Sequence, residues 1–205
     1  MVYIPTKTFY NLDSVKRDRI TKASINEFGK RSFDDAKLSN IIKESRIPRG
    51  SFYQYFDDKK DLYKHIFDII KNKKIEFMSE ELKNEADLPF LEVFRLLYHQ
   101  GIQFAYAYPD FVEIGKHMFN LNKELYDELV GNGFEMAKQY YVGYIEADKT
   151  KGRIREDVDS NTFAGLVISL TTNIAIEELS EDKFDLEKML DKVDSLINIF
   201  KKGIE

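Results

Sequence analysis

The sequence predicts an all-α fold. Apolar side chains recur at the i, i+3, i+4 spacing that gives a helix one buried face, and no long stretch alternates polar and apolar residues as a strand does. The sequence contains neither an internal repeat nor a low-complexity segment. With 205 residues and 43% hydrophobic side chains, the chain can bury a core and is long enough for one large domain or two small ones.

The composition argues against several classes of protein. The chain has no cysteine, which excludes a disulfide framework, a thiolate zinc site and a cysteine nucleophile, and which fits a reducing cytoplasm. The first residues lack a basic region followed by an apolar run, so no signal peptide is expected. The longest uncharged stretch, residues 160–176, contains serine, threonine and asparagine, which suit a buried helix better than lipid. We therefore expect a cytoplasmic protein that does not enter a membrane.

The net charge of −5 hides an uneven distribution. Residues 1–75 hold 17 basic and 10 acidic side chains, a balance of +7, whereas residues 76–205 hold 14 basic and 26 acidic side chains, a balance of −12. A basic segment favours a polyanionic partner and an acidic one does not. The alternative is ordinary compositional drift between the two parts of the chain.

Residues 33–62 have the pattern of a helix-turn-helix. Leu38, Ile41 and Ile42 predict a short amphipathic helix over residues 37–45, because their spacing places them on one face. A helix this short needs other helices to pack against before it is stable.

The second helix of this pair is expected over residues 49–56. Pro48 disfavours helix at the residue before it, but it is well tolerated in the first turn of a new helix. Phe52 and Phe56 are four residues apart and fall on one face, which leaves polar and basic side chains to point outward. An outward face of this kind indicates a binding partner.

A longer helix is expected before this pair, over residues 13–28. Asp13 or Ser14 can cap its beginning, and Gly29 with the polar residues after it is expected to end it. Residues 1–12 show no clear period and are interpreted as an arm. The three helices together predict one small unit.

Prolines, glycines and polar loops divide the rest of the chain. A long helix capped by Asp57 or Asp58 is expected to connect the basic segment to the acidic one. An interruption is expected at Gly131 and Gly133. The remaining helices are expected at residues 58–82, 89–107, 111–119, 124–147, 162–179 and 186–200.

The last two of these helices predict self-association. Residues 162–179 are apolar on nearly all sides, and the final helix has apolar side chains in alternating steps of three and four. An antiparallel pair of such helices can form a four-helix bundle across a two-fold axis, the alternative being that both pack within one monomer. The residues expected at the homodimer interface are Phe163, Leu166, Val167, Leu170, Ile174, Met189, Val193, Leu196, Ile197 and Phe200.

The run RGSFYQYFDDKKDLY, residues 49–63, resembles the recognition helix and the start of the fourth helix in the TetR family of bacterial transcriptional regulators. The upstream runs RITKASINEFGKRSF and IIKESRIPRG are also similar, so the resemblance covers residues 16–63. It implies an N-terminal three-helix helix-turn-helix DNA-binding domain over residues 1–58. A larger helical domain for ligand binding and dimerisation is then expected over residues 59–205.

The chain departs from the family pattern at two places. Ala36 and Lys37 stand where many members have a threonine or serine, which removes a hydroxyl that could cap the helix or contact a phosphate. Arg46 stands in the turn where glycine is usual. If that position needs a positive φ, arginine costs about 1 kcal/mol of local strain.

The resemblance implies that residues 49–56 enter the major groove of double-stranded DNA, and that a dimer binds a palindromic operator. Arg49 can pair with guanine and Gln54 with adenine, while Gly50 allows close approach to the duplex. Cations at a helix start oppose its dipole, so function explains Lys59 and Lys60 better than stability does. The phosphate contacts expected are Lys37, Ser39, Ser51, Tyr53, Tyr55, Lys59 and Lys60. The alternative for the two tyrosines is packing against the first helix, and the alternative for the two lysines is a solvated face.

The central helices are rich in aromatic residues, and the resemblance places them around a cavity for a small-molecule effector. Such cavities are mostly apolar, so an apolar or aromatic ligand is expected to release the protein from DNA by favouring another conformation. The alternative is that the rings only fill the core. The residues expected at this pocket are Phe94, Tyr98, Phe104, Tyr108, Phe111, His117, Phe119, Tyr140, Tyr141, Tyr144 and Phe163.

No catalytic or metal-binding pattern is apparent. Glu113 and His117 share a helix face, but two ligands are too few for a metal site, and His99 is isolated. We therefore expect no catalytic residues, no metal and no cofactor. Two alternatives to a DNA-binding regulator stay open: a helical enzyme that binds a small molecule, and a module whose helix-turn-helix docks another protein.

Overall fold

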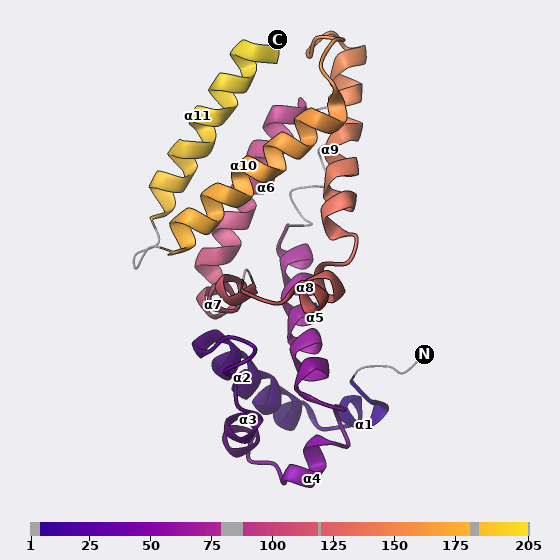
Figure 1. Ribbon diagram of the computed structural model, residues 1–205, viewed down its shortest axis with the longest axis vertical. Helices are drawn as coiled ribbons and strands as arrows, with labels where there is room; N and C mark the ends of the chain where they lie inside the picture. The colour runs from indigo at the N-terminus through magenta and orange to yellow at the C-terminus, as the bar shows by residue number, and fades with distance from the viewer. Residues whose placement is uncertain (1–4, 79–87, 119, 181–184, 205) are drawn as a thin grey trace. The chain divides into compact units, whose positions relative to one another are not determined.

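The computed structural model describes residues 5–78, 88–118, 120–180 and 185–204. These residues contain α-helices and no β-strand, which confirms the all-α prediction (Figure 1). The chain divides into two compact units. The first comprises Met1–Ile75 and Ala107–Leu129, and the second comprises Glu76–Tyr106 and Val130–Glu205. These units are defined by packing. The boundary predicted between a DNA-binding domain ending at residue 58 and a ligand-binding domain starting at residue 59 is a division by function, and it stays a prediction.

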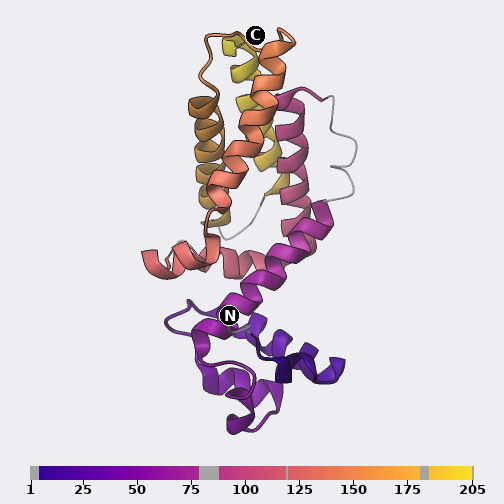
Figure 2. The same ribbon diagram turned by 90° about the vertical axis from the view of Figure 1, so that its right-hand side faces the viewer.

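The first unit contains the helix-turn-helix and two helices from the middle of the chain. Its helices are α1 (Lys7–Tyr10), α2 (Ser14–Lys30), α3 (Leu38–Ser45), α4 (Arg49–Phe52), most of α5 (Lys59–Met78), α7 (Pro109–Met118) and most of α8 (Lys123–Val130). The second unit contains α6 (Phe90–Ala107), α9 (Gly133–Thr150), α10 (Ser160–Ser180) and α11 (Leu186–Ile204). Figure 2 shows these four helices packed alongside one another.

An aromatic cluster forms the core of the first unit. The rings of Phe52 and Phe56 lie 5.5 Å apart, and Phe56 lies 5.1 Å from Phe9. Phe28 from α2 meets Tyr63 from α5 edge to face at 4.8 Å. Because α3 and α4 are too short to be stable alone, they depend on this core, to which both helices contribute buried side chains.

Helix α2 also packs closely against α7. Gly29 makes this possible, because a Cβ at that position would lie 3.5 Å from the Cβ of Glu113 and 3.6 Å from the carbonyl oxygen of Asp110. The helix ends at Lys30, within the predicted run of residues 29–32, but it continues through Gly29, which allows the two helices to approach.

Two other predicted boundaries need correction. Part of the predicted arm is a short helix, because Phe9 is buried in the core and anchors α1. The predicted helix over residues 49–56 ends at Phe52, but hydrogen bonds from the N–H groups of Tyr55 and Phe56 to the carbonyl of Phe52 continue the turn. Both predicted anchors, Phe52 and Phe56, are buried as expected. Residues 79–82, the predicted end of α5, lie outside the described part of the chain.

A buried carboxylate fixes the start of the bundle in the second unit. Asp148 from α9 accepts a hydrogen bond from the backbone N–H of Phe90 at 2.7 Å and pairs with Arg153 at 2.7 Å. Phe90 then contacts Tyr141 and Phe163 edge to face, both at 5.5 Å. Asp148 thus caps the beginning of α6 while the aromatic rings fill the core behind it.

The expected break in the helix over residues 124–147 is confirmed. Gly131 has a φ of 54°, a left-handed conformation that glycine adopts without strain, and it separates α8 from α9. The N-terminal cap of α5 is confirmed as well. Asp58 accepts from the N–H of Asp61 at 2.8 Å, and Asp61 accepts from the N–H of Asp57 at 3.2 Å.

Candidate DNA-binding site

Helices α2 and α3 are joined by the carboxylate of Glu27, which is only 4% exposed. It accepts hydrogen bonds from the backbone N–H of Lys37 at 2.8 Å, from the side-chain amide of Asn40 at 3.0 Å, and from Arg31 at 2.8 Å. Lys37 makes no side-chain cap of its own at the start of α3. Glu27 therefore ties the residue before α3, and Asn40 in the first turn of α3, to α2.

The turn between α3 and α4 has a positive φ at Arg46, the conformation in which arginine is strained. Arg46 has a φ of 52°, and it is the non-glycine residue with positive φ among the described residues. The N–H of Ile47 donates to the carbonyl of Ile42 at 3.3 Å, which closes the end of α3. Arg19 donates to the carbonyl of Ser45 at 2.6 Å and so ties this end to α2.

Helix α4 has one buried side and one exposed side. Phe52 is fully buried, whereas Arg49, Gly50 and Gln54 are exposed and Tyr53 is 50% exposed. No atom outside its own helix lies within 4 Å of where a Cβ of Gly50 would be, so packing within the protein does not require glycine there. Four of the residues predicted to bind DNA are therefore accessible to solvent along α4 and the turn after it.

The segment before α2 holds the end of this surface. The side-chain hydroxyl of Thr6 donates to the carbonyl of Gln54 at 2.6 Å, and its backbone N–H donates to the carbonyl of Tyr55 at 3.1 Å. Sequence reasoning missed this contact, because a hydroxyl 48 residues from its partner gives no local signal.

Tyr55 packs inside the protein, as the alternative interpretation proposed. Its side chain is 3% exposed, its ring lies 6.2 Å from the ring of Phe9, and the ammonium of Lys16 lies 5.6 Å from its centroid. The other predicted phosphate contacts near the turn are accessible: Lys37 and Ser39 are exposed and Ser51 is half-buried.

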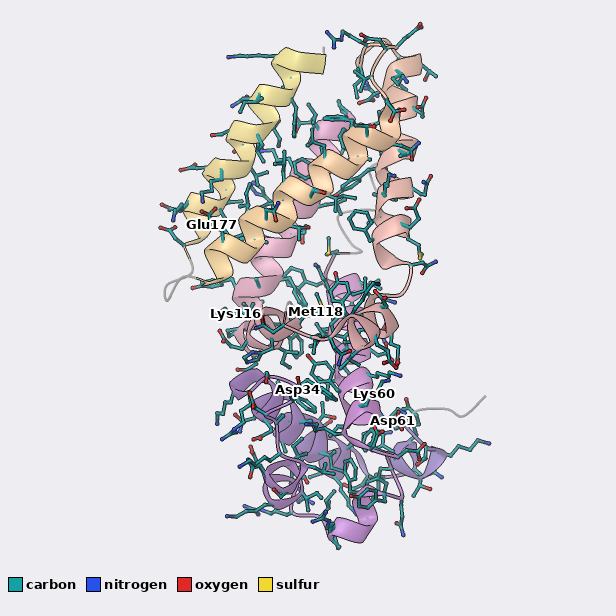
Figure 3. The ribbon with its side chains drawn as sticks, viewed as in Figure 1. Asp34, Lys60, Asp61, Lys116, Met118 and Glu177 are labelled. Carbon is teal, nitrogen blue, oxygen red and sulfur yellow. The ribbon has the colours of Figure 1, made fainter. Side chains whose placement is uncertain are left out.

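The two lysines at the start of α5 have partners within the first unit. Lys59 donates to the carbonyl oxygens of Asp34 at 3.2 Å and Ala36 at 3.0 Å, and its ammonium lies 4.7 Å from the ring centroid of Phe33. Lys60, labelled in Figure 3, pairs with Glu128. These contacts give both lysines a structural role at the start of α5 that does not require DNA. That either lysine contacts a phosphate stays a prediction.

The residues predicted for a ligand pocket fall in both units. Tyr108 and Phe111 stack at 5.3 Å in the first unit, where His117 approaches the carbonyl of Gly29 at 3.1 Å. Phe94, Tyr98, Phe104, Tyr140, Tyr141, Tyr144 and Phe163 belong to the second unit, and Phe119 lies outside the described residues. In the second unit the rings contact one another, as Phe94 and Tyr141 do at 6.2 Å.

The predicted dimer residues also divide into two groups. Phe163, Val167, Met189, Val193, Ile197 and Phe200 are buried against other parts of the same chain. The surface that α10 and α11 leave accessible includes Leu166, which is 46% exposed, and the partly exposed Leu170, Ile174 and Leu196. Any contact between two copies through these helices would use this second group.

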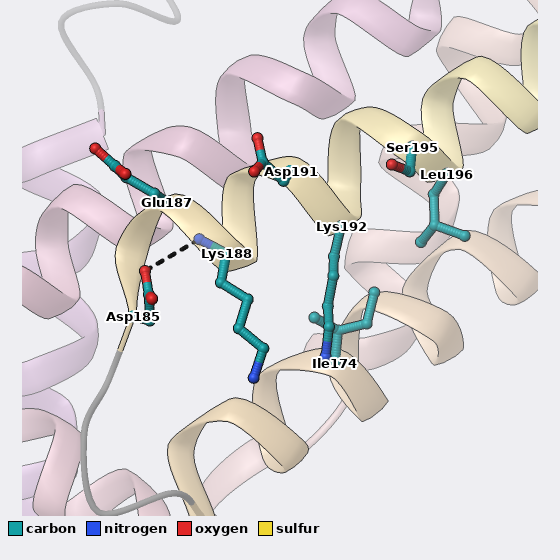
Figure 4. A pocket seen from close by; sticks show the side chains of 8 residues that line it. All are labelled: Ile174, Asp185, Glu187, Lys188, Asp191, Lys192, Ser195 and Leu196. Carbon is teal, nitrogen blue, oxygen red and sulfur yellow. Dashed lines mark hydrogen bonds between the residues drawn. The ribbon is translucent and has the colours of Figure 1, made fainter.

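A groove of about 610 Å³ lies between α10 and α11 (Figure 4). Its lining is mostly charged: Asp185, Glu187, Lys188, Asp191 and Lys192, together with Ser195, Ile174 and Leu196. Ile174 and Leu196 are predicted dimer residues, and none of the predicted ligand-pocket residues lines the groove.

The described residues contain no group of three or more histidine, aspartate or glutamate side chains that could hold a metal ion. Within the same residues, no helix combines the length and hydropathy needed to cross a membrane.

Comparison with known proteins gives the same interpretation. Residues 20–66 match the family model described as "Bacterial regulatory proteins, tetR family". The helix-turn-helix regulator YdgC of Bacillus subtilis, itself uncharacterized, is 27% identical over 80% of this chain and 79% of its own. IcaR of Staphylococcus epidermidis, a negative regulator of the biofilm operon, is 25% identical over 91% of this chain and 99% of its own.

A solved structure shows the same fold. The Bacillus subtilis regulator FadR in complex with stearoyl-CoA superposes with a TM-score of 0.72 over 88% of this chain and 96% of its own, at 18% identity. The matched family model covers α3, the turn and α4, which are the elements that form the exposed surface described above. Over residues 20–66 the chain therefore matches the TetR family of bacterial transcriptional regulators, and over most of its length it is similar to helix-turn-helix regulators.

Proposed function

We propose that this protein is a ligand-responsive transcriptional repressor that binds a palindromic operator as a homodimer. A small apolar or aromatic molecule would bind the C-terminal part of the chain and release it. In this proposal residues 1–58 bind DNA, and residues 59–205 bind the ligand and the second copy. The protein acts by binding and is not an enzyme.

The observation that carries the DNA-binding part is the two-sided character of α4. Phe52 anchors α4 in the core, while Arg49 of α4 and Gln54 of the turn after it are exposed at the surface. Their guanidinium and amide groups are the types that pair with guanine and adenine edges in the major groove. Glu27 and Thr6 hold the two neighbouring segments, so this face is supported by hydrogen bonds rather than left on a free loop.

The relatives support the regulatory part. IcaR is named a negative regulator, which favours repression over activation for this chain. FadR binds stearoyl-CoA, which supports a small-molecule effector with an apolar portion. The aromatic side chains of α6 and α9 supply apolar surface for such a ligand.

The proposal is tested by titrating the purified chain into a labelled duplex from upstream of its own gene, with a scrambled duplex of the same composition as control. We expect the upstream duplex to bind more tightly by a factor of about 10³ or more at physiological salt. Equal binding of the two duplexes, or no binding, would favour the enzyme or the protein-docking module.

The ligand is tested separately on the preformed complex. Stearoyl-CoA is the probe, and coenzyme A without the acyl chain is its control. Release by the first and not by the second would support an apolar ligand. Release by neither would remove this ligand class and leave the DNA-binding proposal intact.

A further inference from the structure

Two charged pairs face each other between α5 and α8 in the first unit. Lys60 and Lys64 are one helical turn apart on α5, and Glu124 and Glu128 are one turn apart on α8. The ammonium of Lys60 lies 2.5 Å from one carboxylate oxygen of Glu128 and 3.9 Å from Glu124. Lys64 pairs with the other oxygen of Glu128. One carboxylate thus holds two ammonium groups.

The contact favours the charged forms of Lys60 and Glu128. The hydrogen bond with Lys60 lowers the pKa of Glu128, and the same bond raises the pKa of Lys60. The side chains of Lys60, Lys64 and Glu128 are each about one-third exposed, so salt ions and other anionic groups can reach them. A lysine in this position can exchange one anionic partner for another.

Lys60 is the second residue of α5, which follows α4 and its exposed residues in the chain. We propose that Glu128 competes with DNA phosphates for Lys60 and thereby lowers the affinity of the protein for DNA of every sequence. This inference rests on the DNA binding proposed above. A lysine that reaches a phosphate releases condensed counterions and adds to the salt dependence of binding, whereas a lysine held by Glu128 adds nothing until that pair breaks.

The consequence concerns the affinity for all DNA and not the ratio between operator and non-operator sites. Phosphate contacts fix position but carry no sequence information. Withholding one of them weakens binding to the very large number of non-operator sites that compete for the protein. Glu128 would therefore limit retention on random DNA.

The test compares Glu128→Gln with Asp127→Asn. Each substitution removes one negative charge from α8, and the two positions are adjacent. Asp127 pairs with Lys123 on its own helix and is more than half exposed, so its loss releases no lysine of α5. The affinity for a random-sequence duplex is measured at several salt concentrations by fluorescence anisotropy.

We expect Glu128→Gln to bind the random duplex several-fold more tightly at low salt. The slope of log K against log salt should steepen by about 0.9 for each lysine that reaches a phosphate. Asp127→Asn should leave the slope unchanged. The double variant Glu128→Gln, Lys60→Ala should return to the wild-type slope, which would assign the effect to Lys60 rather than Lys64.

Circular dichroism and thermal unfolding of each variant show whether the fold is kept. If the wild type binds its operator but Glu128→Gln and Asp127→Asn have the same slope, the inference is overturned and the proposed function stands. If the wild type binds no DNA, the proposed function itself fails.

Discussion

The carboxylate of Glu27 accepts a hydrogen bond from the backbone N–H of Lys37 at 2.8 Å. This contact spans the loop from α2 to α3 and fixes the residue that precedes the first turn of α3, where no side chain of α3 makes a cap of its own. The geometry of the helix-turn-helix therefore depends on a buried side chain of α2.

Replacing Glu27 with alanine should destabilise the protein. The N–H of Lys37 and the amide of Asn40 would lose their acceptor in a partly buried place, which costs about 1–3 kcal/mol for each group left unsatisfied. The free energy of unfolding in urea measures this. Glu44→Ala is the matched control, because Glu44 pairs with Asn26 at an exposed place, and we expect a change within about 0.5 kcal/mol. Equal losses in the two variants would refute the role of Glu27 in tying α3 to α2.

Replacing Lys59 with alanine should lower stability as well as DNA affinity. The variant loses hydrogen bonds to two carbonyl oxygens and the contact with the ring of Phe33, which together are worth about 1–3 kcal/mol. Lys43→Ala, at an exposed lysine of α3, is the control for charge. A Lys59 variant of unchanged stability that binds all DNA weakly would show that Lys59 acts only at phosphates.

Thr6→Val should reduce discrimination between operator and random DNA. The substitution keeps the shape and the backbone N–H of Thr6 but removes the hydroxyl that donates to the carbonyl of Gln54. Because that bond holds the end of the DNA-facing surface, we expect a several-fold loss for the operator and little change for random DNA. Thr8→Val removes a hydroxyl from the exposed side of α1 and serves as the control. Equal effects of both valines would dismiss the positional role of Thr6.

Protein stability should fall in mild acid because of His65. Burial lowers the pKa of His65 to about 4, against about 6.5 in an unfolded chain. Between these values the unfolded state binds more protons, so the free energy of unfolding decreases as the pH falls from about 6.5 toward 4, by about 2–3 kcal/mol in all.

The measurement is urea unfolding of the wild type and His65→Phe at several pH values. Phenylalanine fits a site where the imidazole already packs at 5.1 Å from Phe9 and 5.7 Å from Phe56. The variant should show a flatter dependence in this window. Parallel curves would mean that His65 is not the group responsible.

Much of the fold could be predicted because local rules determine it. Asp58 caps α5, Gly131 separates α8 from α9, and Pro48 marks the start of α4, each for a reason visible within a few residues. The exposed face of α4 followed in the same way from the spacing of Phe52 and Phe56. These features need no knowledge of the rest of the chain.

The missed features depend on residues far apart in sequence. Tyr55 is buried because Phe9 and Lys16 cover it, and Thr6 reaches Gln54 across 48 residues. Lys60 meets Glu128 across 68 residues. Periodicity shows that a side chain has a free face, but it cannot show which distant segment covers that face.

The central claim is that the exposed face of α4 reads DNA sequence. The measurement is the dissociation constant for the scrambled duplex divided by that for the upstream duplex. It is made for the wild type, for Arg49→Ala and for the control Lys202→Ala, which removes an exposed lysine of α11. Loss of one bidentate base contact is worth about 1–3 kcal/mol, so Arg49→Ala should reduce the ratio by about 5- to 150-fold and Lys202→Ala should leave it unchanged. A ratio that stays the same in Arg49→Ala would show that α4 does not read the operator through this residue.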